Sequence, residues 1–398
     1  MTAPRLTARV EDATLVPVGG PARLALAHLP RPQEIATAVA AARGVSEWVF
    51  DRLVVTAVPS RLIDAAGRVG GEPLASLVRE VVDPALAGWL GSPPDVHTTA
   101  GVLPSSLRPL VMGVLNVTPD SVSDGGGNYD PSDHPGAAVA AGEALVAAGA
   151  DLVDVGGEST RPGADAVSTD EELARVVPVI TALAARGIVV SVDTTKAVVA
   201  RAAVEAGAVM VNDVSAGHLD ADLLPTVAAL GVPYVLTHMQ GTPRTMQAEP
   251  RYGDVVGDVF DALAGSLDEL RALGVPRDRI VVDPGIGFGK TVDHNLQLLR
   301  RLRELTSLGC PVMVGTSRKS FIGRLTGTTD ASDRLEGSLV TAALAVANGA
   351  RFVRVHDVRA TVRSVLVAHA VTTAVTEDTS GGSSSDGATA VAGALPSS

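Results

Sequence analysis

The stretch LVMGVLNVTPDSVSDGGG, residues 110–127, indicates how the chain folds. It begins with Leu110–Leu115, an apolar run of strand length, and continues into a polar loop that carries hydroxyls, carboxylates and glycines. Parallel α/β proteins present their chemistry in this way, because a buried strand delivers the loop at its carboxyl end to the surface. The stretch therefore predicts one strand of a parallel sheet, followed by a loop with functional groups.

From Leu110 onward the same unit recurs, consisting of a short apolar strand, a polar loop and a helix rich in Ala, Leu and Val. Eight such units predict a (β/α)8 TIM barrel, and the polar ending of nearly every strand favours this closed barrel over a doubly wound open sheet. The expected strands are Val111–Val117, Leu152–Val155, Ile188–Val192, Val209–Asn212, Tyr234–Thr237, Ile280–Val282, Val312–Val314 and Phe352–Val355. Expected helices include Ala137–Ala148, Glu171–Ala185, Thr195–Ala206 and Asp333–Ala347.

Two segments flank the predicted barrel, which we assign to residues 108–372. Residues 1–100 form an N-terminal accessory region in which we find no motif that carries chemistry. Residues 376–398 are rich in Ser, Gly and Ala, a composition that predicts a disordered C-terminal tail. The elements expected in the accessory region are two helices, Gln33–Arg43 and Pro73–Val82, and one strand, Arg52–Val58.

Composition narrows the class of protein. The chain has 398 residues, of which 46% are hydrophobic, so it can bury a large core. Its net charge of −12 argues against binding to nucleic acid or to an anionic membrane. We find neither the apolar core of a signal peptide nor an apolar run of membrane-spanning length. The single cysteine, Cys310, excludes an internal disulfide, is expected to be buried and favours a reducing, cytoplasmic location.

Polar residues follow most of the predicted strands and would meet on one face of the barrel, because all its strands point the same way. Among them, Asp193, Asn212 and Asp283 follow three different strands. Carboxylates accept hydrogen bonds from ring N–H and NH₂ groups, and an amide both donates and accepts. These three side chains therefore predict a site that grips the edge of a flat, polar heterocycle.

Donor groups at the same predicted face suit an anion. Arg161, Lys319, Arg354 and His356 lie at or just after strand ends in a chain that is acidic overall. Positive and hydrogen-bond-donating side chains gathered in an acidic protein are typical of a phosphate or pyrophosphate site. Together with the heterocycle edge, they predict a ligand that joins a polar ring to an anion.

Each of these residues also has a structural interpretation. Asp193 could cap the following helix, and Asn212 and Asp213 could be turn formers. His238 could be a satisfied histidine near the core. The sequence Gly289-Lys290-Thr291 imitates the end of a P-loop but lacks the glycine with which that motif begins. The argument for a site therefore depends on the whole set occurring at strand ends of one topology.

At these motifs the chain resembles dihydropteroate synthase, from about Leu110 to Ala370. The resemblance implies a TIM barrel that joins 6-hydroxymethyl-7,8-dihydropterin diphosphate to 4-aminobenzoate, releases pyrophosphate with the help of Mg²⁺, and works as a homodimer. The motifs that carry it are NVTPDS (116–121), SDGG (123–126), GGESTRPGA (156–164), SVDT (191–194), VNDV (211–214), HMQGTPRTMQ (238–247), DPGIGFGK (283–290), GTSRKSFIG (315–323) and RVHDV (354–358).

The resemblance also implies roles for individual residues. The pterin ring would be held by Asp193, Asn212, Asp283 and Lys319, with Phe288 nearby. The diphosphate would lie against Arg354 and His356, with Asn116 beside it and the metal. The aminobenzoate would be bordered by Thr160, Arg161, Pro162 and Ser320. Asp120 and Asp124 would belong to a first mobile loop, and catalytic roles would fall to Lys319, Asp283, Arg161 and Asp124.

Two positions depart from the family pattern. Val122 stands where the family usually has Phe over the aminobenzoate, and Thr237 stands where it commonly has Met against the pterin. Both changes remove apolar bulk near a substrate. They support one alternative, a non-catalytic pterin-binding paralogue. A second alternative, a pterin-dependent methyltransferase domain on the same barrel, would not need the Ser-Arg-Lys and Ser-Thr-Arg-Pro-Gly elements.

Overall fold

The computed structural model describes residues 94–118, 135–159 and 166–374, together with the backbone of six strands nearer the N-terminus. The predicted strand Arg52–Val58 is confirmed as β4, Arg52–Ala57. The predicted helix Gln33–Arg43 lies outside the described residues, as does Pro73–Val82 apart from Pro73, which ends a strand. The predicted disordered tail also lies outside them.

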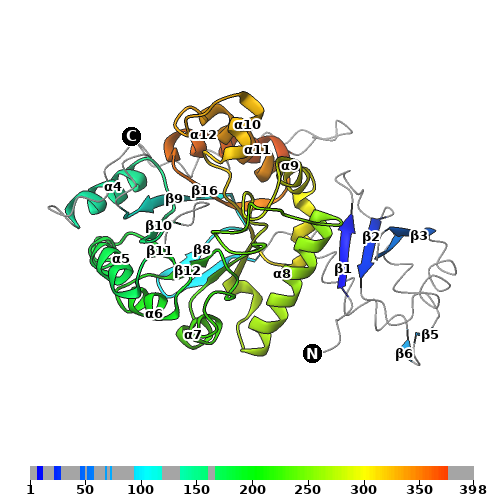
Figure 1. Ribbon diagram of the computed structural model, residues 1–398, viewed down its shortest axis with the longest axis horizontal. Helices are drawn as coiled ribbons and strands as arrows, with labels where there is room; N and C mark the ends of the chain where they lie inside the picture. The colour runs from blue at the N-terminus through cyan, green and yellow to red at the C-terminus, as the bar shows by residue number, and fades with distance from the viewer. Residues whose placement is uncertain are drawn as a thin grey trace, which may run out of the picture.

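Eight parallel strands close into a barrel, and the last strand pairs with the first. The prediction of a (β/α)8 barrel is therefore confirmed, and the open sheet is excluded. The helices pack around the outside of the barrel (Figure 1). The barrel strands are β9 (Leu110–Asn116), β10 (Leu152–Gly156), β11 (Val190–Asp193), β12 (Met210–Asp213), β13 (Tyr234–Thr237), β14 (Ile280–Asp283), β15 (Val312–Val314) and β16 (Ala350–Val355).

The helices that connect these strands agree with the predicted ones to within two residues at each end. They are apolar on the side that covers the strands, and the strands read as continuous apolar runs because both of their faces are buried. The α-helices are α4 (Gly136–Ala147), α5 (Thr169–Ala184), α6 (Ala197–Glu205), α7 (Leu223–Leu230), α8 (Val255–Ala272), α9 (Val292–Arg300), α10 (Ser320–Thr326), α11 (Leu335–Ala347) and α12 (Val358–Thr373). The described residues also include two 3₁₀ helices, η2 (Arg277–Arg279) and η3 (Leu302–Leu308). Within the described part of the chain, no helix is both long and apolar enough to cross a membrane.

The inside of the barrel is filled by an apolar layer at the amino ends of the strands. Every strand except β11 contributes to it, and all of these side chains are buried. Its members are Leu110, Met112, Leu152, Met210, Val235, Val281, Met313 and Phe352. Because the barrel is solid at this end, a ligand can enter only from the carboxyl ends of the strands.

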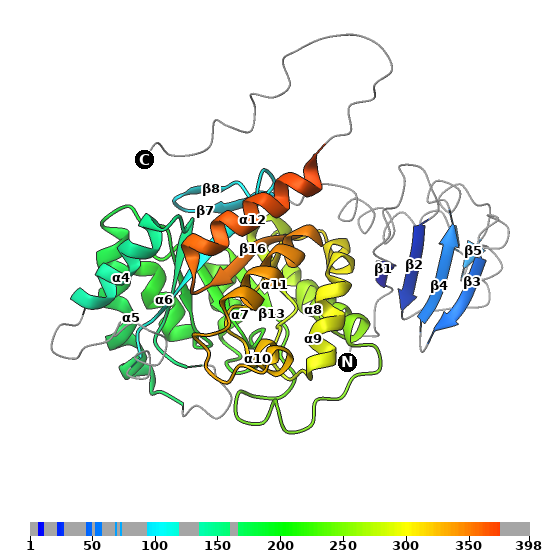
Figure 2. The same ribbon diagram turned by 90° about the horizontal axis from the view of Figure 1, so that it is seen from above.

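A short hairpin, which the sequence did not predict, packs onto this apolar layer. It consists of β7 (Val96–Thr98) and β8 (Gly101–Leu103), and its Val96 and Leu103 are buried among the interior side chains of the barrel. The hairpin spans residue 100, where we expected the accessory region to end (Figure 2).

The strands before residue 94 form sheets of their own. Four of them make an antiparallel sheet in the order β1-β2-β4-β3, and β1 lies beside α8 and η3 (Figures 1 and 2). A second pair, β5 and β6, forms a small ribbon. The bounds are β1 (Thr7–Glu11), β2 (Ala22–Ala27), β3 (Val45–Val49), β4 (Arg52–Ala57), β5 (Arg68–Val69) and β6 (Glu72–Pro73).

Candidate active site

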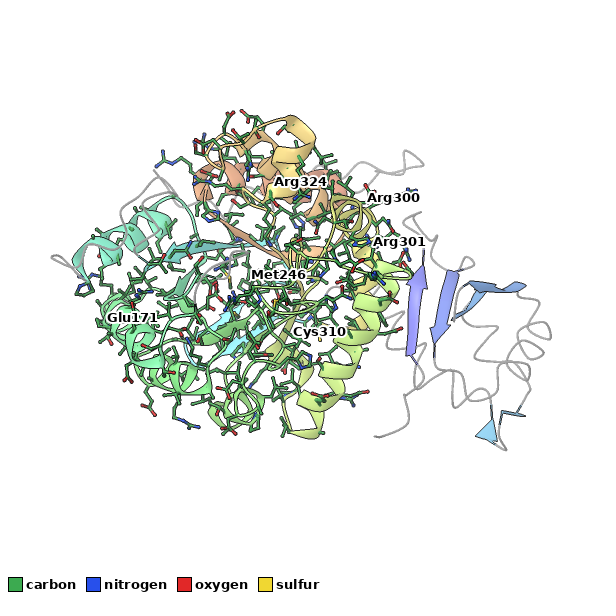
Figure 3. All side chains as sticks on the ribbon, viewed as in Figure 1. Glu171, Met246, Arg300, Arg301, Cys310 and Arg324 are labelled. Atoms are coloured by element: carbon green, nitrogen blue, oxygen red, sulfur yellow. The ribbon has the colours of Figure 1, made fainter. Side chains whose placement is uncertain are left out.

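A cavity of about 640 Å³ opens at the carboxyl ends of the barrel strands. Met246, labelled near the centre of Figure 3, is one of its lining residues. The cavity brings together all the site residues predicted from the sequence that the structure describes. They are Asn116, Asp193, Asn212, Asp283, Phe288, Lys319, Ser320, Arg354 and His356. The remaining predicted site residues, Asp120, Asp124, Thr160, Arg161 and Pro162, lie outside the described residues, as does Val122.

The alternation of side chains along each strand explains why these residues converge. Asn212 follows Met210 by two positions, Asp283 follows Val281, and Arg354 follows Phe352. Residues two apart on a strand face the same side, so each polar residue stands one layer above an interior apolar one. The inside of the barrel thus changes from apolar to polar at one level along its axis, and this level forms the floor of the cavity.

A buried carboxylate that the sequence interpretation missed organises this floor. Asp154 in β10 is fully buried, and its Oδ2 accepts hydrogen bonds from Asn212 Nδ2 at 2.8 Å and from Arg354 Nε at 2.6 Å. Arg354 Nη2 donates to Asp193 Oδ2 at 2.7 Å, so the guanidinium lies between two carboxylates. The arginine expected to meet an anion is therefore held in place by Asp154 and Asp193.

The pKa values of two carboxyl groups on the floor, those of Asp193 and Asp283, are raised. Burial raises the pKa of Asp193 to about 7, although the charge of Arg354 opposes the shift, and the nearby Asp154 adds to it. Burial likewise raises the pKa of Asp283, against the charge of Lys319 and a hydrogen bond from the Gly285 amide. Among the described residues, Asn212 Oδ1 has no hydrogen-bond partner although it is buried. Such an acceptor favours a ligand that brings its own N–H groups.

Lys319 and Phe288 form one wall of the cavity. The Lys319 ammonium donates to the carbonyl of Ile286 and lies 4.5 Å from the centroid of the Phe288 ring, over its face. Burial lowers the pKa of Lys319 to about 8, and the charge of Asp283 opposes this shift. The wall therefore combines an aromatic face with an ammonium whose charge can change near neutral pH.

The turn between β15 and α10 presents Lys319 to the cavity. Arg318 has a φ of 58°, in the left-handed region that a residue with a side chain rarely adopts. Its guanidinium donates to both oxygens of Asp357, at 3.0 and 2.7 Å, which holds this conformation. Beside it, Ser317 Oγ lies 3.0 Å from His356 Nδ1. Contacts thus join the turn to the residues at the end of β16, at the wall of the cavity.

Other polar residues considered in the sequence turn out to be structural. Asp213 faces the outer helices, where its carboxylate accepts from the Tyr234 hydroxyl at 2.6 Å and from two backbone amides. His238 Nδ1 lies 2.9 Å from Lys290 Nζ, and burial lowers the pKa of this imidazole to about 3. Cys310 is buried, as predicted, with its pKa raised by burial to about 12.

Lys196 holds the two described ends of the connection between β10 and α5. Its ammonium donates to Glu158 Oε2 at 2.7 Å, to the carbonyl of Val167 at 2.7 Å and to Glu172 Oε2 at 2.5 Å. Glu158 Oε1 in turn accepts from the amide of Val167 at 3.0 Å. Glu172 is fully buried, so the lysine also neutralises a charge inside the protein.

We expect Lys196→Met to lower the free energy of unfolding by on the order of 2 kcal/mol. The change leaves the carboxylate of Glu172 buried without its cation, and removing one partner of such a pair costs more than removing both. Chemical denaturation of the variant, compared with the double variant Lys196→Met/Glu172→Gln, measures the effect. If the single variant is as stable as the wild type, or if the second change restores nothing, the pair has no such role.

Fold and site together define a barrel enzyme for a polar heterocycle that carries an anion. Residues 112–356 match the model of a family described as pterin binding enzyme. A dihydropteroate synthase from Mycobacterium leprae is 50% identical over 273 residues, which cover 66% of this chain and 93% of the relative.

Solved structures agree with this match. A Yersinia pestis dihydropteroate synthase in complex with a sulfonamide drug superposes with a TM-score of 0.67 at 42% identity, covering 70% of this chain and all of that one. A Xanthomonas albilineans dihydropteroate synthase in complex with 7,8-dihydropteroate superposes with a TM-score of 0.63 at 43% identity, covering 71% of this chain and all of that one. The chain belongs to the dihydropteroate synthase family of pterin-binding enzymes.

Proposed function

We propose that the protein joins 6-hydroxymethyl-7,8-dihydropterin diphosphate to 4-aminobenzoate, giving 7,8-dihydropteroate and pyrophosphate. The observation that carries this proposal is the polar floor of the cavity, where Asp193, Asn212 and Asp283 meet beside Arg354. A floor of acceptors next to a fixed guanidinium suits a ring rich in N–H groups that bears an anion. The related X. albilineans enzyme, whose structure contains 7,8-dihydropteroate, supports the same chemistry.

The pterin would lie flat on the cavity floor. Its amino group and ring N–H groups would donate to Asp193, Asp283 and the buried Oδ1 of Asn212, which has no partner among the described residues. Phe288 would cover one face of the ring, and Lys319 would contact its acceptor edge. Thr237 also lines the cavity and is nearly buried. It would give the pterin a polar contact, whereas a methionine at this position would give an apolar one.

The diphosphate would lie against Arg354 and His356 at the end of β16. Two nitrogens of the guanidinium are held by carboxylates, and Nη1 makes no hydrogen bond to the described residues. A donor that is already oriented loses little entropy when the ligand arrives, which favours tight binding of the anion.

We propose that the reaction also uses Mg²⁺. Among the described residues, no cluster of three His, Cys, Asp or Glu side chains could hold a metal, but the amide of Asn116 lines the cavity. Mg²⁺ accepts such a site because it keeps several waters and takes oxygens from substrate phosphates. We propose that Asn116 would contact the ion, which when bound would supply charge neutralisation on the leaving pyrophosphate.

The chemistry would be a substitution at the exocyclic methylene carbon of the pterin. The bond from this carbon to the diphosphate oxygen breaks, and the electron pair leaves with pyrophosphate, whose charge Arg354 and His356 compensate. The carboxylate of Asp283 would stabilise the cation that develops on the pterin. The aniline nitrogen then attacks with its lone pair and loses a proton to solvent, so no strong general base is needed.

The second substrate, 4-aminobenzoate, would bind beside the pterin. We propose that Ser320, which lines the cavity at the start of α10, borders the aminobenzoate. Thr160, Arg161, Pro162 and Asp124 are proposed to serve the same substrate and the chemical step, and all four lie outside the described residues.

Pyrophosphate release tests the proposed function. Purified protein is mixed with the pterin diphosphate and Mg²⁺, with and without 4-aminobenzoate, and dihydropteroate is identified by mass spectrometry. We expect release that depends on the aminobenzoate and matches product formation. Absence of release despite tight binding of the pterin diphosphate would indicate a non-catalytic pterin-binding paralogue instead.

We further propose that the enzyme is a cytoplasmic homodimer. The single cysteine, which is buried, supports a reducing compartment. The dimer is supported by four exposed apolar side chains on the adjacent helices α11 and α12, whose contact includes a bond from Ser364 Oγ to the carbonyl of Leu339. These apolar side chains are Val340, Leu344, Val367 and Val371, between 52% and 71% exposed.

We expect Leu344→Glu to convert the dimer to a monomer at micromolar concentration. A carboxylate would have to be desolvated within an apolar contact, which opposes association without disturbing the exposed surface of the monomer. Light scattering coupled to size-exclusion chromatography measures the mass. Leu325→Glu, at an exposed apolar position on α10, is the control. Equal masses for the wild type and Leu344→Glu would remove this face from consideration.

A further inference from the structure

The loop that follows β14, residues 284–290, is held by side chains along four consecutive carbonyls. The carbonyl of Ile286 accepts from Lys319, and that of Gly287 accepts from Gln247 Nε2 at 2.6 Å. The carbonyl of Phe288 accepts from Lys290 Nζ at 3.0 Å, and that of Gly289 accepts from the Tyr252 hydroxyl at 2.9 Å. Each of these donors is a different side chain, and Gln247 and Tyr252 come from the segment between β13 and α8.

The loop needs this support because of its glycines. Gly285, Gly287 and Gly289 have φ values of 67°, 85° and 64°, all in the left-handed region. A side chain at Gly285 would collide with the carbonyl of His238, so the loop also lies directly on the neighbouring segment. Glycines lose more conformational freedom on ordering than other residues, so a loop with three of them does not keep one shape unaided.

Lys290 is the central member of this group of donors. Its amine nitrogen is buried, donates to the carbonyls of Phe288 at 3.0 Å and of His238 at 3.3 Å, and lies 2.9 Å from His238 Nδ1. It also lies 5.8 Å from the centroid of the Tyr252 ring. These contacts of one side chain join the loop after β14 to the end of β13.

The loop positions two groups that the proposed function needs. Asp283 immediately precedes it, and its Oδ1 accepts from the amide of Gly285 at 2.7 Å. The amide of Phe288 donates to the carbonyl of Gly285 at 3.0 Å, so the aromatic ring and the carboxylate are set by one compact turn. A shift of this turn would move both groups relative to the cavity floor.

We propose that Lys290 and Tyr252 are positioning residues that hold Phe288 and Asp283 against the pterin ring, an inference that rests on the proposed function. Neither residue needs to touch the reacting atoms. Their effect on binding is expected to be confined to the ring side of the site, because Arg354 and His356 belong to β16 and its end, and the contacts that hold them come from other elements.

The test uses two probes of the full-length protein, 6-hydroxymethylpterin followed by its fluorescence and inorganic pyrophosphate followed by calorimetry. We expect Lys290→Met to raise the Kd of the pterin by about tenfold and Tyr252→Phe to raise it by about threefold, while the Kd of pyrophosphate changes less than twofold. Thr245→Ala is the matched control, because this exposed residue lies in the same segment and its hydroxyl bonds only to Thr242 among the described residues. It should leave both values unchanged.

Two outcomes would overturn the inference. One is unchanged pterin affinity in both variants, and the other is an equal loss of pterin and pyrophosphate binding, which would indicate general damage to the fold. Tyr252→Phe removes a single hydroxyl, so it decides the matter if Lys290→Met does not fold. Failure of the wild-type protein to bind the pterin would instead contradict the proposed function, and the two failures are therefore distinguishable.

Discussion

Replacing Asp193 by alanine should weaken the binding of 6-hydroxymethylpterin by on the order of 100-fold. Asp193 is nearly buried at the end of β11, and the ligand is proposed to donate to its carboxylate. A hydrogen bond to a charged group is worth about 1.5–3 kcal/mol, and the upper end of this range corresponds to about 100-fold in Kd. The fold should persist, because Arg354 loses its bond to Asp193 but keeps its bond to Asp154, at 2.6 Å.

Fluorescence titration of the pterin measures this loss. Ser191→Ala is the matched control, because Ser191 lies two residues earlier on the same strand and its buried hydroxyl has no partner among the described residues. The control should bind the pterin as the wild type does. Wild-type affinity in Asp193→Ala would show that the carboxylate serves only to orient Arg354, and the pterin would then have to bind elsewhere in the cavity.

The barrel could be predicted because its strands are buried on both faces and therefore appear in the sequence as short apolar runs. The bounds of Tyr234–Thr237 and Val312–Val314 agree with the structure. β16 begins at Ala350 rather than Phe352, because Ala350 pairs with Val312 across the sheet and nothing local in the sequence reveals that partner. The hairpin β7–β8 was missed because strands of three residues are too short to show a period.

The site could be predicted where a polar residue ends a strand, and it was missed where a polar residue lies within one. Asp154 interrupts the apolar run that begins at Leu152. Because residues two apart on a strand face the same side, its spacing from Leu152 could have indicated that Asp154 faces the inside of the barrel. Alternation also separates Asn212, which was predicted to face the ligand, from Asp213, which faces the other side of the strand. The contacts of Lys290 join two loops, and no spacing in the sequence could have indicated them.

Replacing Lys319 by methionine should lower kcat by about 10³-fold, at the upper end of the effect of removing one oriented electrostatic donor. Methionine keeps an unbranched apolar side chain one atom shorter than that of lysine, so the change removes the charge over the Phe288 ring and the bond to the carbonyl of Ile286. Steady-state rates of dihydropteroate formation at saturating substrates measure the loss, and Lys319→Arg serves as the variant that keeps the charge. Near-wild-type turnover in Lys319→Met would exclude the residue from the chemistry.

The pH dependence of the same enzyme gives an independent test of Lys319. Its pKa is lowered to about 8, mainly by burial, so the ammonium predominates at pH 7 and is lost as the pH rises through 8. If the charged form is the active one, kcat of the wild type should fall with a midpoint near that value. In Lys319→Arg the guanidinium stays protonated, so the decline should disappear from this range. A decline that persists in Lys319→Arg would have to come from another group, and the titration of Lys319 would then not set the pH dependence of kcat.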